Sequence, residues 1–361
     1  MIKNIKNDTF QISDAKEKEY LKMLAGFKKI SVAVVGDIIA DEYIYGSCER
    51  ISREAPVLIL RHASSKITPG GGGNAAANVA ALGALVYSIG VVDNGTAASE
   101  VMKYYEKNGI NTDYIIKSKK YDTCVKTRIM SGSLHTTLQQ VIRIDRGGET
   151  AITEGDADAL LEKFKKAVKK VDTVLISDYN CGLFTDYFTK GLQEILKNES
   201  SKRKIFVIVD SRHRLFDFKY AYTATPNESE AHEASGVKIV GRESLIKCGE
   251  ILKGKTGNKT MVITRGSKGM AFFDEAGRLF ELPITRRDEI ADVTGAGDTV
   301  AATLSASLPL VKKTPVLAVE LANIAGGAKV MKRGTAQVSA DEIAAEITRI
   351  KKIQNFSLQN N

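Results

Sequence analysis

The chain of 361 residues lacks tryptophan and contains only six prolines, four cysteines and four histidines. No C-x-x-C pair occurs among the cysteines and no H-x-x-x-H pair among the histidines, which argues against a zinc site. The four cysteines are widely separated (Cys48, Cys124, Cys181 and Cys248). For such a pattern we expect free thiols in a reducing compartment.

Long apolar runs are also missing. No stretch approaches the roughly 18 apolar residues that cross a bilayer. Residues 1–29 alternate charged and apolar side chains and contain no apolar segment typical of a secretory signal. These absences predict a cytoplasmic protein with no membrane partner.

Basic residues outnumber acidic ones, 52 to 43, which gives a net charge of +9. That charge would suit an anionic substrate such as a nucleotide or a sugar phosphate, and it would also suit nucleic acid. The lysines are spread along the chain, however, and no basic run carries interleaved aromatic residues. We therefore expect a small-molecule substrate and no nucleic-acid partner.

Short β-branched segments alternate with amphipathic segments. The expected buried strands are residues 30–36, 85–92, 173–177, 205–209 and 260–264, and the expected helices are residues 97–108, 156–170, 186–197 and 242–253. This alternation predicts an α/β fold in which helices cover both faces of a mostly parallel sheet. Asp37, Asp178 and Asp210 each follow an expected strand, at the edge where such sheets bind ligands.

Two segments depart from this alternation. Residues 43–62 and 123–145 alternate apolar and polar side chains, and each contains a glycine at which we expect a turn, Gly46 and Gly132. A period of two residues predicts extra antiparallel strands. These strands would form a small β-sheet lid beside the main domain.

The segment from Asp292 to Thr299, DVTGAGDT, is the most informative about function. Gly295, Ala296 and Gly297 lie at the start of an expected helix, where unpaired backbone N–H groups can bind an anion. Asp298 cannot bind that anion, but it can take a proton from a neighbouring hydroxyl. Phosphoryl transfer to an alcohol requires this combination. A glycine turn with an aspartate cap on an ordinary helix would have the same pattern.

Two further motifs indicate a sugar. Four glycines, residues 70–73, allow close approach of the backbone to a ligand, and Asn74 can donate to and accept from hydroxyls. The alternative for this segment is a flexible linker. Asp37 and Asp41 could accept hydrogen bonds from adjacent hydroxyls, or each could cap a turn.

Two other motifs indicate a nucleotide and its metal ion. Asn227 and Glu230 lie at an expected helix start and could hold hydrated Mg²⁺ near phosphates, or they could form a capping pattern. Residues 264–269, TRGSKG, form a glycine turn after an expected strand. That turn could contact a nucleotide, or it could simply join a hairpin.

Together these motifs resemble those of the ribokinase-like (PfkB) family of ATP-dependent sugar kinases. The resemblance covers about residues 30–350 and rests on the Gly-Gly…Asn segment near Asn74 and on residues 292–299. It implies a three-layer α/β/α kinase domain at residues 30–350 with a lid from about residues 42–66 and 121–146. Residues 1–29 would be an N-terminal extension and residues 351–361 a C-terminal tail. It also implies a homodimer joined through the lid.

Within this family the chain is most similar to kinases of D-glycero-D-manno-heptose 7-phosphate, which act in ADP-heptose and lipopolysaccharide synthesis. The similar segments are residues 50–52, 54–57, 139–145 and 177–179, together with Pro69. In such enzymes the acceptor is the anomeric hydroxyl, and the product is the 1,7-bisphosphate.

Three segments depart from the heptose-kinase pattern. Cys181 stands where a lysine is usual, Ser211-Arg212 where Pro-Lys is usual, and Arg53 where a proline is usual. A kinase of another sugar or sugar phosphate, such as fructose, ribose or a hexose phosphate, therefore stays open. A non-catalytic sensor with the same fold is a third reading, against which the intact Asp298 argues.

The resemblance also implies roles at matching positions. Asp298 would be the base, and backbone N–H groups around Gly295, Ala296 and Gly297 would stabilise the transferred phosphate. The sugar would be held by Asp37, Asp41, Gly71, Gly72, Asn74, Arg143 and Asp178. The nucleotide would be held by Asn227, Glu230, Thr264, Gly266, Gly269, Asn323 and Arg212. The implied cofactors are ATP, Mg²⁺ near Asn227 and Glu230 through water, and a candidate K⁺ at the carbonyls of Asp292 and Thr294.

Overall fold

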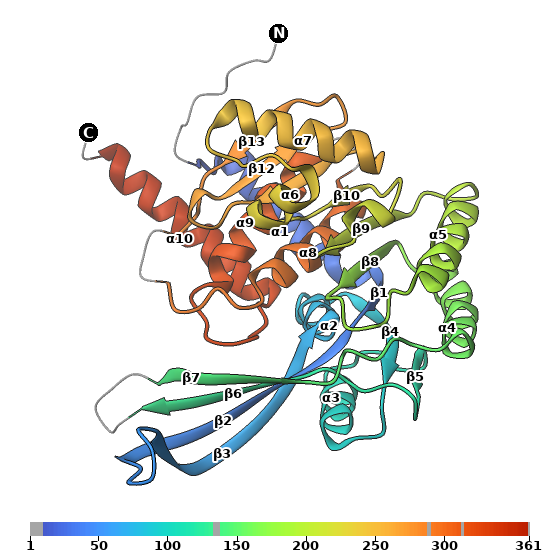
Figure 1. Ribbon diagram of the computed structural model, residues 1–361. Helices are drawn as coiled ribbons and strands as arrows, with labels where there is room; N and C mark the ends of the chain where they lie inside the picture. The colour runs from blue at the N-terminus through green and yellow to red at the C-terminus, as the bar shows by residue number, and fades with distance from the viewer. Residues whose placement is uncertain (1–9, 133–137, 287–289, 312–313, 360–361) are drawn as a thin grey trace.

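A six-stranded parallel sheet forms the centre of the molecule (Figure 1). The computed structural model describes residues 10–132, 138–286, 290–311 and 314–359. In spatial order the strands are β10 (Thr223–Ala224), β9 (Phe206–Ser211), β8 (Thr173–Asp178), β1 (Ser31–Gly36), β4 (Leu85–Val92) and β5 (Ile115–Lys117). Gly36, Ser177 and Asp210 are neighbours in register, so the three aspartates expected at strand ends gather at one edge.

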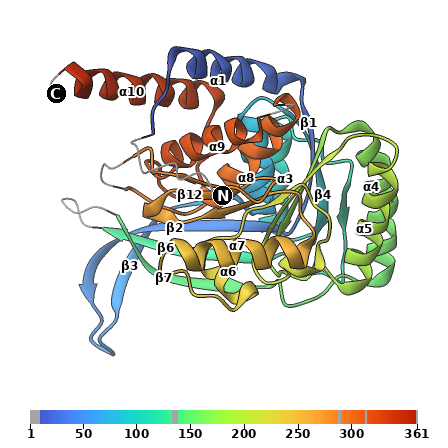
Figure 2. The same ribbon diagram turned by 90° about the horizontal axis from the view of Figure 1, so that it is seen from above.

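Helices cover both faces of this sheet, as the sequence predicts (Figure 2). Because strand side chains alternate, Val32 and Val34 of β1 pack in one core and Ala33 and Val35 in the other. The first layer consists of α1 (Asp14–Gly26), α2 (Gly72–Ala81), α3 (Thr96–Lys107), α8 (Ala296–Ser307), α9 (Pro315–Lys329) and α10 (Ala340–Gln359). The second consists of α4 (Glu154–Ala167), α5 (Asp186–Ser200), α6 (Glu228–Ser235) and α7 (Arg242–Thr256). The fold is therefore the three-layer α/β/α arrangement that the sequence resemblance implies.

The strand expected at residues 260–264 lies outside the parallel sheet. It forms β11 (Met261–Thr264), which pairs antiparallel with β12 (Met270–Phe273), and β12 pairs with β13 (Leu279–Leu282). The glycine turn at residues 264–269 joins β11 to β12 as a hairpin, one of its two expected outcomes, and a short hairpin connection imposes antiparallel pairing. Thr264 N still donates to Pro226 O (3.0 Å), which places this small sheet next to β10.

The two alternating segments form a separate four-stranded sheet that projects from the core as a lid (Figure 1). Its order is β3 (Leu58–Gly71), β2 (Ile38–Ile51), β6 (Val125–Gly132) and β7 (Gln139–Arg146). The turn expected at Gly46 is wrong. Gly46 lies inside β2 and pairs with His62, and the register shift after Tyr45 leaves Ala63 of β3 as the extra residue of a bulge, so β2 continues through the glycine. Gly132 ends β6. The expected antiparallel pairing is confirmed for β2 with β3 and for β6 with β7, whereas β2 and β6 in the middle of the sheet pair parallel.

Helix α1 lies within the expected N-terminal extension and packs beside α10 (Figure 2). Tyr20 Oη donates to Glu320 Oε2 of α9 (2.6 Å), and Lys351 of α10 pairs with Asp14 and Glu17. The expected domain end at residue 350 falls inside α10, which continues to Gln359. Among the helices of the described residues, none is both long and apolar enough to span a bilayer.

Candidate active site

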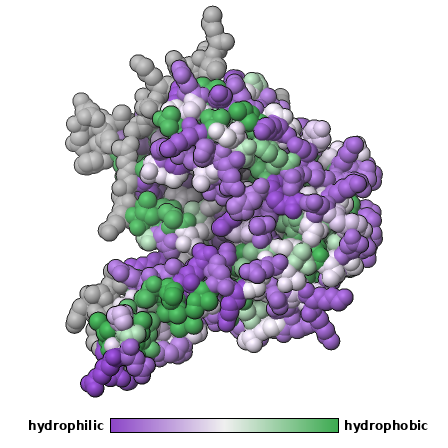
Figure 3. Space-filling view, in the orientation of Figure 1, coloured by the Kyte–Doolittle hydropathy of each residue, from purple (hydrophilic) through white to green (hydrophobic). Residues whose placement is uncertain are grey.

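A cleft of about 370 Å³ opens where the carboxyl ends of β8 and β9 face the lid and the start of α8. Figure 3 shows the hollow between the lid and the rest of the molecule. The cleft brings together the predicted residues Asp41, Gly71, Arg143, Asp178, Arg212, Asn227, Glu230, Thr264, Thr294, Gly295, Gly297 and Asp298. The glycine segment near Gly71, the Asn227–Glu230 pair and the segment of Asp298 thus meet at one place, although the first and last are more than 200 residues apart in the sequence.

Asp298 lies in the first turn of α8 and is only 3% exposed. Its two carboxylate oxygens accept hydrogen bonds from Asn74 Nδ2 (2.6 Å) and Tyr179 Oη (2.8 Å). Burial raises the pKa of Asp298 to about 6, although both hydrogen bonds act in the opposite direction. A carboxylate poised near neutral pH is suited to general base catalysis.

The start of α8 supplies an anion cradle beside this base. Gly295 caps the helix with a φ of 77°, a conformation that favours glycine. Ala296 N donates to Val293 O (3.2 Å), so the N–H of this predicted donor is already engaged. The N–H groups of Gly297 and Asp298 have no partner among the described residues. These two groups, with the helix dipole, are placed to bind an anion.

Asp37 lies behind the cleft and does not line it. Its carboxylate accepts from Tyr179 N (2.7 Å) and Leu183 N (3.2 Å), which orients the loop that carries Tyr179. Burial and the neighbouring Asp178 raise the pKa of Asp37 to about 7. The structure therefore connects Asp37 to the cleft through the backbone of that loop.

Asn74 and Gly72 also lie behind the cleft surface. Asn74 is fully buried, and besides holding Asp298 it accepts from Gln337 Nε2 (3.2 Å). Gly72 begins α2 against Gly36, where an added Cβ would lie 2.9 Å from Gly36 Cα. Asn74 thus contacts the predicted base directly and is not exposed to the cleft.

Asn227 and Glu230 were expected either to cap a helix or to lie near Mg²⁺ and phosphates, and their positions are consistent with both. They form a capping box on α6, in which Asn227 Oδ1 accepts from Glu230 N (2.9 Å) and Glu230 Oε2 accepts from Asn227 N (2.8 Å). Both also line the cleft, near Asp210. Burial, Asp298 and Glu230 raise the pKa of Asp210 to about 8, so negative charge is concentrated at this end.

These residues fit a hydrated Mg²⁺ better than a fully protein-bound one. Among the described residues, no group of three or more His, Cys, Asp or Glu could hold a metal ion. Mg²⁺ usually keeps several waters and takes only one or two carboxylates plus substrate phosphates. Glu230, with one oxygen outside the capping box, meets that requirement.

A second cavity of about 200 Å³ adjoins the cleft and shares Thr264, Val293 and Gly297 with it. It is lined by the predicted nucleotide residues Gly266, Gly269 and Asn323 and by apolar side chains that include Met270, Ile284, Val300 and Val330. An apolar slot that opens beside an anion cradle suits a base and its phosphates. The predicted residues of the nucleotide end therefore lie together.

At the opposite end of the cleft, acidic and basic lid residues are paired. Asp41 Oδ1 accepts from Arg128 Nη1, and the Arg128 guanidinium lies 5.4 Å from the ring centre of Tyr43. Arg143 makes two hydrogen bonds to Asp145, of 2.7 and 2.5 Å. Asp41 is 3% exposed, so the contact with Arg128 orients this predicted sugar ligand.

Asp292 and Thr294, the candidate K⁺ residues, lie in the loop before α8. The Asp292 carboxylate accepts from Thr294 N (2.9 Å) and Gly334 N (2.8 Å). Although burial opposes it, these hydrogen bonds lower the pKa of Asp292. Neither the Asp292 nor the Thr294 carbonyl accepts a hydrogen bond from a described residue.

For four residues of the site, the sequence predicted no role. Tyr179 holds Asp298, Arg128 holds Asp41, Lys126 lines the cleft, and Gln337 holds Asn74. Tyr179 could have been found, because it follows an expected strand next to Asp178. No local pattern marks the other three, which reach the site through lid register or a distant loop.

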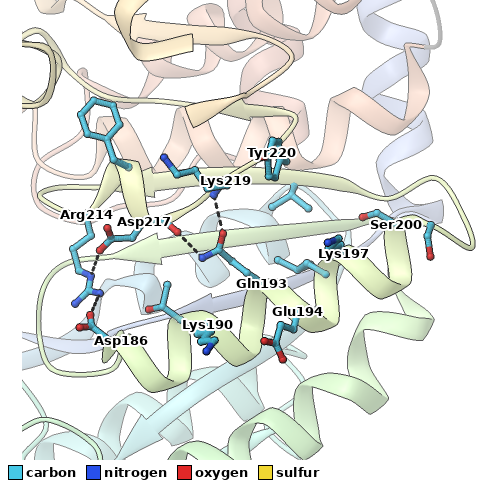
Figure 4. A pocket seen from close by; sticks show the side chains of 15 residues that line it. Asp186, Lys190, Gln193, Glu194, Lys197, Ser200, Arg214, Asp217, Lys219 and Tyr220 are labelled. Carbon is cyan, nitrogen blue, oxygen red and sulfur yellow. Dashed lines mark hydrogen bonds and ion pairs between the residues drawn. The ribbon is translucent and has the colours of Figure 1, made fainter. Parts of the chain in front are cut away.

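A wider cavity of about 850 Å³ lies along α5 and the segment 214–220 (Figure 4). Its polar side chains are largely paired with one another. Arg214 contacts Asp186 and Asp217, and Gln193 accepts from Lys219 N (2.9 Å). None of the predicted site residues lines it, so its volume alone does not make it the reactive site.

Comparisons with known proteins agree with this geometry. The family described as pfkB family carbohydrate kinase matches residues 29–342. The chain is 36% identical over 329 residues to Bifunctional protein HldE of Azorhizobium caulinodans, covering 91% of this chain and 66% of that protein. It is 36% identical over 317 residues to the protein of the same name from Aliarcobacter butzleri, covering 88% of this chain and 64% of that one. The chain thus spans about two thirds of the length of these relatives.

Solved structures share the fold. Phosphofructokinase-2 from Escherichia coli in complex with fructose-6-phosphate has a TM-score of 0.69 at 16% identity, covering 89% of this chain and 99% of that one. The same enzyme in complex with potassium has the same TM-score, identity and coverage. Arabidopsis thaliana ribokinase complexed with ribose and ATP has a TM-score of 0.64 at 18% identity, covering 90% of this chain and 99% of that one.

Proposed function

Since the chain belongs to the pfkB family of carbohydrate kinases and is a phosphotransferase that acts on a sugar hydroxyl, we propose that its acceptor is D-glycero-D-manno-heptose 7-phosphate. It would transfer the ATP γ-phosphate to the anomeric hydroxyl and release the 1,7-bisphosphate. The observation that carries the chemistry is Asp298, buried where the two cavities adjoin, beside two backbone N–H groups that have no partner in the described part of the chain. The family match also supports a kinase domain at residues 30–350.

In this mechanism the acceptor hydroxyl lies against Asp298, which takes its proton as the new P–O bond forms. Asn74 and Tyr179 orient the carboxylate, and the N–H groups of Gly297 and Asp298 stabilise charge on the transferred phosphate. Asp41, held by Arg128, would accept hydrogen bonds from the sugar. Most of the rate enhancement then comes from positioning and electrostatics. The lid would exclude water, which would otherwise accept the phosphate.

A kinase of this family uses ATP and Mg²⁺. Glu230 with Asn227 would hold the waters of Mg²⁺, which would supply positive charge to the phosphates. We also assign a monovalent cation such as K⁺ to the loop of Asp292 and Thr294, whose carbonyls have no described donor. The phosphofructokinase-2 complex with potassium supports this assignment.

The identity of the acceptor rests on the lid and loop segments similar to heptose 7-phosphate kinases and on about 36% identity to proteins named HldE. A fold shared with phosphofructokinase-2 and ribokinase keeps a hexose phosphate or a pentose as the second candidate. Cys181 and Arg212 stand at positions that differ from the heptose-kinase pattern. A difference in acceptor specificity from the heptose kinases would therefore arise at these two residues.

ATP consumption by the purified protein should be measured with heptose 7-phosphate, fructose 6-phosphate, fructose and ribose. Turnover on heptose 7-phosphate at least about tenfold above the others is the expected result. The Asp298→Asn variant provides the blank for contaminating kinases. Faster turnover on another sugar would discard the heptose and keep the kinase, and no turnover on any sugar would contradict the proposed function.

The dependence of activity on pH follows from the environment of Asp298. Its carboxylate must be ionised to accept a proton, so kcat/KM should rise with pH through about 6, the pKa of this group. Tyr179→Phe removes a hydrogen bond that favours the ionised form, so this rise should shift to higher pH. Full pH profiles of both proteins test this. An unchanged acidic limb in Tyr179→Phe would show that another group controls it.

The lid is also the proposed dimer contact. Its apolar residues are unusually exposed for a soluble domain and form patches along the sheet (Figure 3). They are Ile51, Val57, Leu58, Ile59, Leu138, Val141, Ile142 and Ile144. A second copy of the chain would cover them. The molar mass in solution should be twice that of the chain, and Ile142→Lys should reduce it to a monomer; a wild-type monomer contradicts the proposal.

A further inference from the structure

Two of the four cysteines, which are far apart in the sequence, are in contact in the fold. Cys124 lies directly before β6 and Cys181 lies in the loop after β8, and their two thiols form a hydrogen bond with each other. Both pack with Ile39 in a small buried cluster that is separate from the two large cores. A Cβ on Gly148 would lie 3.2 Å from Cys124 Sγ and 3.4 Å from Cys181 Cβ, so both side chains meet at one point. Sulfurs in contact reach the roughly 2 Å of a disulfide bond by a small movement.

The two thiols differ in how readily they ionise. The hydrogen bond from Cys181 lowers the pKa of the Cys124 thiol, although burial opposes it, and the charge of Lys126 adds to the lowering. The same hydrogen bond, together with burial and the charge of Asp37, raises the pKa of the Cys181 thiol. The thiolate is the form of cysteine that attacks an oxidant. Cys124 is therefore the thiol that reacts first, and Cys181 stays protonated beside it.

A glycine backbone separates this thiol pair from solvent. Cys124 is 4% exposed and Cys181 is 6% exposed. Gly148, which lies against both, is half-buried and belongs to the segment between β7 and α4, where Gly147 and Glu149 on either side are exposed. An oxidant as small as hydrogen peroxide therefore reaches Cys124 through a local opening of this segment.

The pair lies between the base of the lid and the loop that orients the predicted general base. Cys124 O accepts from Ala40 N of β2 (2.9 Å), so Cys124 belongs to the lid sheet where this sheet leaves the core. Cys181 follows Tyr179 by two residues, and the Tyr179 hydroxyl donates to Asp298 (2.8 Å). A covalent bond between the two sulfurs would tie the lid to this loop. Lids of enzymes open and close in each turnover, so such a bond would restrain that movement.

We propose that Cys124 and Cys181 form a reversible oxidation site, at which a peroxide converts the two thiols to a disulfide that slows turnover. In the first step the Cys124 thiolate attacks one oxygen of hydrogen peroxide, the O–O bond breaks, and a sulfenic acid and hydroxide form. The Cys181 sulfur then displaces the sulfenic oxygen, which leaves as water with the proton of the Cys181 thiol.

The reaction is balanced by the oxidant alone. The hydroxide takes up the proton that Cys124 lost when it ionised, so the two thiols lose two electrons and two protons and hydrogen peroxide becomes two water molecules. A dithiol reductant reverses the oxidation by thiol–disulfide exchange. The effect on turnover rests on the proposed function, whereas the formation of the disulfide does not.

Mass spectrometry tests the oxidation site without any assay of activity. After brief exposure to hydrogen peroxide, the wild type should lose the mass of two hydrogen atoms and yield one disulfide-linked pair of peptides, which contain Cys124 and Cys181. Dithiothreitol should restore the original mass. In Cys181→Ser the oxidation should stop at the Cys124 sulfenic acid, which a cyclic diketone traps. A wild type that keeps all its thiols under peroxide, or a disulfide that joins other cysteines, would overturn the proposal.

The effect on turnover is measured on the same samples. The oxidised wild type should show a kcat at least about threefold lower than the reduced protein, because a tethered lid moves less freely, and dithiothreitol should restore it. Cys124→Ser nearly keeps the size of the side chain and should be as active as the reduced wild type but insensitive to peroxide. Cys48→Ser and Cys248→Ser are the matched controls, one at a half-buried and one at a buried thiol outside the cluster, and both should stay sensitive.

Three results would count against the proposal. Equal inhibition of the wild type and Cys124→Ser by peroxide would place the oxidised group elsewhere in the chain. A complete disulfide with an unchanged kcat would overturn the effect on turnover. If the reduced wild type phosphorylates no sugar, the proposed function fails, and the mass measurement alone then decides the oxidation site, whose absence would be the third contrary result.

Discussion

Asp298→Asn is expected to lower kcat by about a hundred- to ten-thousandfold, the usual contribution of a general base. The amide has the shape of the carboxylate but cannot accept the proton of the sugar hydroxyl. It also fits the two existing contacts, since its oxygen can accept from Asn74 Nδ2 while its NH₂ group faces the Tyr179 hydroxyl, which can accept. The fold and the binding of ATP should therefore persist. Steady-state kinetics with calorimetric titration of a non-hydrolysable ATP analogue would measure both.

The two measurements on Asp298→Asn distinguish a loss of proton transfer from a loss of nucleotide binding or of the fold. A loss of kcat with unchanged nucleotide affinity and unchanged unfolding midpoint is what a proton acceptor predicts. Turnover close to that of the wild type would remove Asp298 from the mechanism. In that case Asp210, a second cleft carboxylate whose pKa is raised by burial, would be the next group to change.

Gly295→Ala should be the most disruptive small substitution in the site. Gly295 has a φ of 77°, and an added Cβ would lie 2.7 Å from Asn74 Nδ2. An alanine held in this left-handed conformation costs about 1 to 3 kcal/mol of folding free energy. The collision would also displace the amide that orients Asp298, so kcat should fall together with the stability to chemical denaturation.

Gly297→Ala provides the matched comparison two residues along the same helix. Its added Cβ would meet no atom within 4 Å, and its φ is not in the left-handed region. This variant should keep the stability of the wild type and lose activity only to the extent that a bound phosphate approaches the Gly297 backbone. Equal destabilisation by both substitutions would show that the conformation of Gly295 is not the cause.

Much of the architecture could be predicted because it depends on local patterns. The β-branched runs at residues 85–92 and 173–177 form strands close to those limits, since an apolar run between two amphipathic segments can only be buried in a covered sheet. The DVTGAGDT segment likewise indicated a helix start with a base, because glycine conformation and helix polarity are local properties. The strand at residues 260–264 was assigned to the wrong sheet because pairing partners are not local.

The side chains that hold the site residues in place could not be predicted, for the same reason. Asn74 was expected to hold a sugar, yet its amide lies on Asp298, a contact across 224 residues of sequence. Gln337 and Arg128 reach their partners only after the lid and the loop before α10 are in place. The sequence shows only that an asparagine, glutamine or arginine is present, and not whether its side chain binds a ligand or another side chain. The burial of Asn74 decides between these roles, and burial is a property of the folded chain.

The length of the lid strands determines where closure has its effect. β2 has 14 residues, so its far end lies roughly 46 Å from its start at Ile38, whereas Asp41 lies only about 10 Å along it. A hinge rotation of about 10° at Ile38 would sweep the far end through roughly 8 Å but move Asp41 by less than about 2 Å. Asp41, the carboxylate that we propose contacts the sugar, therefore lies close to the axis of such a rotation. Opening can admit solvent and substrate at the tip while the position of Asp41 relative to Asp298 is nearly conserved.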